Sequence, residues 1–175
     1  MHLSGLMKGL ARGLAIVGGL ALVAITVITV VSITGRGLGA FGLKPIPGDF
    51  ELVEAGTAFA VFAFLPWAQL TRGHATVDVF TSFLSARVNR IIDVIAEFVM
   101  TAVIILIAVQ LWHGMWDKVR YNETTFILQF PVWWGFAAAM VAATIGVVVS
   151  LYVLLVRVME LRQGRTILGG QGVVH

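Results

Sequence analysis

Polar residues whose types could support chemistry are grouped where an apolar run ends. In the stretch LPWAQLTRGHATVDVF, residues 65–80, Arg72, His74 and Asp78 follow one another within a few positions. A histidine and an aspartate four residues apart would need a further ligand or a nucleophile to form a zinc or catalytic site. The chain contains no cysteine, and the stretch holds no second histidine. We therefore interpret the cluster as the point where a helix leaves a membrane and turns, with its charged residues facing lipid headgroups.

A second candidate is a pair of acidic residues inside an apolar segment. Asp93 and Glu97 lie four positions apart and therefore on one face of a helix. Ionisable residues within a membrane span are functional candidates by default, for example in a proton or ion relay. The other apolar segments contain no acid at mid-depth to continue such a relay. We favour the interpretation that Asp93 pairs with Arg90 or Asn89 and that Glu97 turns toward a neighbouring helix or a partner subunit.

The residue types also argue against bound cofactors. Haem in a helical membrane protein needs axial histidines well inside the membrane, whereas His74 and His113 are expected at opposite surfaces. The absence of cysteine excludes iron–sulfur clusters and thiol chemistry, and no glycine-rich phosphate-binding motif occurs. We expect no catalytic residue, no metal site and no cofactor in this chain.

The composition identifies the class of protein that must position these residues. The 175-residue chain is 59% hydrophobic and 12% charged, with a mean hydropathy of +0.96, whereas a soluble domain carries about 25% charged residues. A membrane-spanning helix needs about 20 predominantly apolar residues. Four segments meet this condition: 14–34, 54–71, 92–116 and 131–156. We predict an all-α integral membrane protein with four transmembrane helices, in a single membrane domain over residues 1–175.

The connections between these segments predict the orientation of the chain. Apolar residues at helical spacing over residues 77–88 predict a short amphipathic helix in the cytoplasmic interface between the second and third spans, and residues 163–175 are expected to form a flexible tail. Eight of the Lys and Arg residues lie on the side of the two termini, and four lie on the other side. Because positive charge favours the cytoplasm, both termini are predicted to be cytoplasmic.

Stripes of small residues predict close packing between helices. Gly5, Gly9 and Gly13 form such a stripe at the start of the first span, and a second stripe lies in the fourth. These stripes face either a second protein or a neighbouring span, because small residues allow the same close approach of helix backbones in both cases. The candidate subunit interface consists of Asp93, Glu97, Ala138, Ala142, Gly146 and Ser150.

Three ordered stretches carry a family resemblance: PIPGDFELVEAG (45–56), FLPWAQLTRGHATVDVF (64–80) and NETTFILQFPVWW (122–134). At these spacings within four spans, the chain resembles the small membrane subunit of tripartite ATP-independent periplasmic (TRAP) transporters, the DctQ-like small permease. The residues at the family's signature positions are Gly48, Asp49, Glu51, Glu54, Pro66, Gln69, Arg72, Gly73, His74, Val77, Asp78, Glu123, Thr124, Thr125 and Pro131. Ser85 stands where such proteins often carry proline, which leaves open whether a break separates the interfacial helix from the third span.

The resemblance implies a function without chemistry in this chain. A periplasmic binding protein would deliver an organic anion or similar solute, and a large multi-span subunit would move it inward with sodium, which that subunit would bind. The small subunit would bind the large one as a scaffold. Charged residues on the external side are candidates for contact with the binding protein: Arg36, Lys44, Asp49 and Glu51.

The leading hypothesis is therefore a non-enzymatic scaffold subunit of a TRAP importer in a bacterial inner membrane. Its expected partners are the large transport subunit, the periplasmic binding protein and membrane lipid, but not nucleic acid. One alternative is a self-contained homo-oligomeric transporter or channel that uses Glu97 for ion coupling. Another is the membrane anchor of a redox enzyme. The sequence names neither the solute nor the stoichiometry.

Overall fold

The computed structural model describes residues 2–71 and 85–163, and this part of the chain is helical. Four long helices span α1 (His2–Gly37), α2 (Asp49–Leu70), α4 (Ala86–Arg120) and α5 (Trp133–Gln163), and a short 3-10 helix η1 covers Gly39–Phe41. The described residues form no β-strand, only an isolated bridge between Thr124 and Pro131. Each of the four long helices is apolar enough to cross a membrane. For the described residues, the predicted all-α class with four helices long and apolar enough to span a membrane is confirmed.

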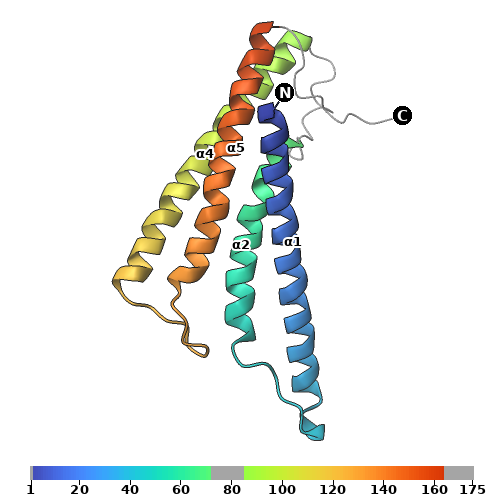
Figure 1. The fold of residues 1–175 in the computed structure, drawn as a ribbon, viewed down its shortest axis with the longest axis vertical. Helices are drawn as coiled ribbons and strands as arrows, with labels where there is room; N and C mark the ends of the chain where they lie inside the picture. Colours follow the sequence, from blue (N-terminus) through green and yellow to red (C-terminus); the bar gives the residue numbers. More distant parts are fainter. Residues whose placement is uncertain (1, 72–84, 164–175) are drawn as a thin grey trace, which may run out of the picture.

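The four helices stand in a row instead of closing into a square bundle. α1 packs against α2, α2 against α5, and α5 against α4, while α1 and α5 make only a small contact (Figure 1). The start of α1 and the end of α5 lie at one end of the molecule, and the loops 38–48 and 121–132 lie at the other. The α1–α2 pair and the α4–α5 pair diverge toward these loops (Figure 1). Which end faces the cytoplasm stays a prediction from the charges.

Small residues allow α1 and α2 to approach closely. A Cβ atom added to Gly18 would lie 2.8 Å from Ala63 Cβ and 3.7 Å from the backbone of Ala60. Near the end of α1, a Cβ on Gly35 would collide with the backbone of Lys44, because the loop crosses the helix there. Ser32 Oγ accepts a hydrogen bond from Ile46 N at 3.2 Å and fixes the same crossing. The first connection is therefore held tightly against α1.

The two small-residue stripes have different surroundings. No atom lies within 4 Å of a Cβ added to Gly5, Gly9 or Gly13, so this stripe is open in the described structure. In α5, Ala142, Gly146 and Ser150 are buried, and a Cβ on Gly146 would be 3.7 Å from Pro66 of α2. Ala138 is exposed. Within this chain, the second stripe serves mainly as the packing face toward α2.

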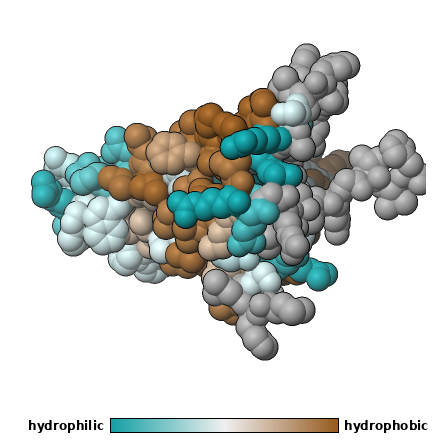
Figure 2. Space-filling view, turned by 90° about the horizontal axis from the view of Figure 1, so that it is seen from above, coloured by the Kyte–Doolittle hydropathy of each residue, from teal (hydrophilic) through white to brown (hydrophobic). Residues whose placement is uncertain are grey.

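Large apolar side chains cover much of the outside. Leu20 and Val23 of α1, Phe98 and Leu106 of α4 and Val141 of α5 are each about 60% exposed. Seen from the end with the termini, hydrophobic side chains form much of the visible surface between separate hydrophilic patches (Figure 2). Such a surface is suited to contact with lipid or with apolar helices of another protein.

The third long helix begins earlier than the predicted span. Ser85 has an extended backbone, and its Oγ accepts a hydrogen bond from Val88 N at 3.4 Å, so it is the N-cap of α4. Residues 86–88 of the predicted interfacial helix thus form the first turn of α4. Residues 77–84 of that prediction, and all but the first residue of the predicted tail 163–175, lie outside the described residues.

Candidate functional site

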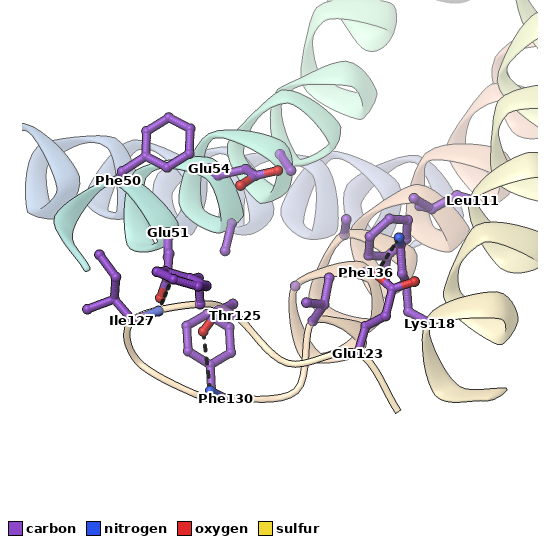
Figure 3. Close-up of a pocket in the computed structure, with 16 residues that line it drawn as sticks. Phe50, Glu51, Glu54, Leu111, Lys118, Glu123, Thr125, Ile127, Phe130 and Phe136 are labelled. Carbon is purple, nitrogen blue, oxygen red and sulfur yellow. Dashed lines mark hydrogen bonds and ion pairs between the residues drawn. The ribbon is translucent and has the colours of Figure 1, made fainter. Parts of the chain in front are cut away.

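A cleft lies at the loop end of the helices, where the α1–α2 pair and the α4–α5 pair diverge. Its volume is about 770 Å³. The first turns of α2 form one wall, the end of α4 and the start of α5 form the other, and the loop 121–132 closes its end (Figure 3). The lining residues are Phe50, Glu51, Glu54, Ala55, Ala58, Leu111, Lys118, Glu123, Thr125, Phe126, Ile127, Phe130, Val132, Gly135, Phe136 and Ala139.

Glu51 attaches the loop to α2. One carboxylate oxygen accepts a hydrogen bond from the backbone N–H of Ile127 at 2.6 Å (Figure 3). The other accepts one from the backbone N–H of Leu128 at 2.9 Å. The residue is only 8% exposed and lies in the first turn of α2, where the helix dipole favours a negative charge. Charge-assisted bonds of this kind are about twice as strong as neutral ones. The carboxylate therefore acts as a clamp that closes the cleft.

The loop is prearranged to meet this carboxylate. Thr125 N donates to Phe130 O and Val132 N donates to Glu123 O, both at 2.9 Å. Gly48, directly before α2, has φ +74°, and a Cβ there would collide with the Leu128 side chain. Only glycine combines this left-handed conformation with so close an approach of the loop.

Charged groups lie at the mouth of an otherwise apolar cleft. Lys118 of α4 donates to Glu123 at 2.7 Å, with both side chains partly exposed. On the opposite wall, the exposed carboxylate of Glu54 has no hydrogen bond or ion pair with another residue of the described ranges. Within those ranges no group of three or more His, Asp or Glu residues could hold a metal ion. The arrangement is suited to binding an amphiphilic group, with apolar walls and both signs of charge at the mouth.

A second polar contact lies nearer the other end, between α2 and α4. Gln69 Nε2 donates to Glu97 Oε1 at 2.5 Å, and Gln69 is 4% exposed. Thr101, one turn beyond Glu97, is also buried, at 3%. Because α2 and α4 have no extensive packing contact, this bond is a specific link between two helices that are not neighbours in the row.

A double-mutant cycle on this link should give a measurable coupling energy. We expect Gln69→Leu and Glu97→Leu to be non-additive by about 0.6 kcal/mol, and at most about 1.7 kcal/mol, the range for hydrogen bonds between membrane helices. The measurement is reversible unfolding in mixed micelles. Gln110, exposed on α4, supplies the control, because Gln110→Leu should not couple to Glu97→Leu. A coupling energy of zero for the Gln69–Glu97 pair would show that the contact does not stabilise the fold.

Sequence reasoning missed one buried ion pair. Arg157 Nη1 and Glu160 Oε2 of α5 lie 2.9 Å apart, and their side chains are 6% and 4% exposed. The signal was present, since an arginine and a glutamate three positions apart follow directly on an apolar run. Arg157 is one of the eight Lys and Arg residues on the side of the termini, and their number alone does not indicate a buried pair.

A model of the DctQ component of tripartite ATP-independent periplasmic transporters matches residues 25–163. The chain belongs to this family. The match begins within α1 and ends with α5, so it includes the cleft and both loops beside it. No curated protein and no solved structure matches the chain.

In this DctQ chain, two of the three sequence stretches that carry the resemblance meet at the cleft. Glu51 and Glu54 come from the first stretch, and Glu123 and Thr125 come from the third; all four line the cavity. Thr124 and Pro131 form the β-bridge at the base of the loop. These signature positions therefore belong to one site in the folded chain, although about 70 positions separate the two stretches.

The middle stretch lies at the opposite end of the DctQ chain. Pro66 is buried within α2 near Gly146, and Gln69 binds Glu97. The remaining signature residues of this stretch lie outside the described residues: Arg72, Gly73, His74, Val77 and Asp78. The interpretation of that turn stays a prediction.

The four candidates for contact with a binding protein have different environments. Arg36 is 67% exposed and lies 3.8 Å from Asp49, so this pair joins the end of α1 to the start of α2. Lys44 is exposed. Glu51 is turned inward to the loop amides. In this DctQ chain, Arg36 and Lys44 are the accessible members of the group.

Proposed function

We propose that this chain is the scaffold subunit of a TRAP importer in a bacterial inner membrane, where it binds and anchors the large multi-span transport subunit. In this proposal a periplasmic binding protein delivers an organic anion or related solute, and sodium binds the large subunit. The observation that carries the proposal is membership of the DctQ family over residues 25–163.

Three acidic side chains have fixed partners within the chain, which supports a structural role. Glu51 holds a loop, Glu97 accepts a bond from α2, and Glu160 pairs with Arg157. Each of these acids has a partner within the described chain. Fixed pairs of this kind favour a rigid frame over a proton or ion relay, in which the carboxylates must exchange partners.

The open row of helices supports a partner that covers one of its faces. α1 and α4 each have a single extensive neighbour, and a Cβ added to Gly5, Gly9 or Gly13 at the start of α1 would meet no atom within 4 Å in the described structure. Close packing at small residues is a major source of helix association in membranes. The large transport subunit would supply the missing helices.

The proposal is tested by purifying the tagged full chain from its native membranes in mild detergent. We expect a much larger polytopic protein to co-purify in a fixed ratio, and cells that lack this chain to lose binding-protein-dependent uptake. Recovery of the chain alone, or only with copies of itself, would overturn the proposal and direct attention to ion flux by the chain in liposomes. Persistence of uptake in the deleted cells would overturn it as well.

A further inference from the structure

We propose that the cleft beside the loop 121–132 binds one phospholipid whose headgroup carries a phosphate and a primary amine. This inference goes beyond the scaffold function and does not depend on it, because every group that it uses belongs to this chain.

Aromatic residues place the mouth of the cleft at the level of lipid headgroups. Trp112 and Trp116 near the end of α4, and Trp133 and Trp134 at the start of α5, are all exposed. Tryptophan is enriched at this level because its ring is apolar and its N–H needs a polar partner. Lys118 follows directly on this belt, so the charged mouth is at headgroup depth and the cleft interior is at the depth of acyl chains.

The interior of the cleft is apolar and bounded by small residues. Ala55 and Ala58 of α2 face Gly135 and Ala139 of α5, and a Cβ on Gly135 would be only 3.4 Å from Ala55 Cβ. Leu111 of α4 completes this wall. α2 and α5 therefore touch at these positions, and the space lies between this wall, the end of α4 and the loop 121–132. Its volume of about 770 Å³ lies within the usual range of about 300–1,000 Å³ for ligand sites.

The cleft narrows toward the middle of the helices. One to two turns deeper, the same three helices leave a gap of only about 10 Å³, lined by Phe62, Leu65, Ile104, Ile107, Ala143 and Gly146. An acyl chain cannot continue inside the protein there. It can leave sideways, because α2 and α4 have no extensive contact with each other. The occupant is therefore an amphiphile whose head is held at the mouth and whose tails join the bilayer.

The charges at the mouth select the headgroup. Glu54 offers a carboxylate with no partner in the described ranges, which suits a primary ammonium with three N–H donors. Lys118 uses one contact on Glu123 and has further donors for a phosphate. A quaternary amine has no N–H to donate, and an anionic glycerol headgroup has no cation. Only a headgroup with both phosphate and primary amine complements both walls.

Native mass spectrometry on the delipidated full chain tests the proposal. The probes are phosphatidylethanolamine, phosphatidylcholine and phosphatidylglycerol with identical acyl chains. We expect one tight phosphatidylethanolamine adduct, weakened about threefold to fivefold by Glu54→Gln, since exposed ion pairs contribute up to about 1 kcal/mol. Asp117→Asn is the matched control, because Asp117 is exposed near the end of α4 but does not line the cleft. Asp117→Asn should leave the affinity for phosphatidylethanolamine unchanged.

A second variant tests the cavity itself. Ala58→Phe fills the cleft from an exposed position and should abolish the tight adduct, whereas Ala102→Phe, at an exposed position of α4 outside the cleft, should retain it. Equal binding of the three lipids to the wild-type chain, or no effect of Glu54→Gln, would overturn the proposal. So would a photoreactive residue at position 58 that, in native membranes, captures a protein and not a lipid.

Discussion

Replacing Glu51 by alanine should release the loop 121–132 and lower the free energy of unfolding by about 2–4 kcal/mol, because the amides of Ile127 and Leu128 lose a charged acceptor. Glu51→Gln should cost less, since one acceptor oxygen remains. The measurements are hydrogen exchange at the two amides and reversible unfolding in mixed micelles.

Glu54 provides the control for this prediction one turn further along α2. Its carboxylate lines the same cleft but has no hydrogen bond or ion pair in the described part of the chain. Glu54→Ala should therefore leave both the exchange of the loop amides and the free energy of unfolding nearly unchanged. If Ile127 and Leu128 remained equally protected in Glu51→Ala, the clamp would be shown not to fix the loop.

Replacing Gly18 by leucine should separate α1 from α2. A Cβ at this position already lies 2.8 Å from Ala63 Cβ, and the rest of the side chain would have no space between the helices. Overpacking of this kind typically costs about 1–3 kcal/mol, and a rigid helix pair cannot adjust locally. We expect the free energy of unfolding to fall by at least this amount and a cysteine cross-link between α1 and α2 to form less efficiently.

The neighbouring Gly19 provides the control for the Gly18→Leu substitution. No atom lies within 4 Å of a Cβ at Gly19, so Gly19→Leu adds the same side chain, in the same turn, toward open space. It should be neutral or slightly stabilising, because glycine costs up to about 1 kcal/mol in a helix interior. Equal destabilisation by the two substitutions would mean that α1 does not pack on α2 through Gly18.

The sequence was sufficient to predict the four helices but not their lengths. Long apolar runs can form little else in a bilayer, because backbone groups there must be bonded within the segment. α1 nevertheless begins at His2 and α4 at Ala86, well before the predicted spans at 14 and 92. The added turns carry Lys8, Arg87 and other polar residues, which a search for apolar residues omits although they continue the helix.

The candidate site could be predicted only in its parts. The resemblance selected Glu51 and Glu123, but no local pattern indicated that the two stretches meet. That contact depends on the order of the helices in space, which periodicity does not encode. Glu97 was expected to face a neighbouring helix or a partner; the structure gives it Gln69 of α2, a helix with which α4 has no extensive contact. Lys118 of α4 and Glu54 of α2 line the same cleft, and this proximity too depends on the order of the helices in space.

The clamp at Glu51 also has a consequence for biosynthesis. Glu51 and Ile127, whose amide donates to the Glu51 carboxylate, are 76 positions apart in the sequence. At a synthesis rate of about 5–20 residues per second, the ribosome adds Ile127 about 4–15 s after Glu51. A carboxylate without hydrogen bonds is not stable in hydrocarbon, so the start of α2 must stay in contact with water during this interval. The cleft is thus completed late in membrane insertion, and a nascent chain that stops before residue 127 cannot form it.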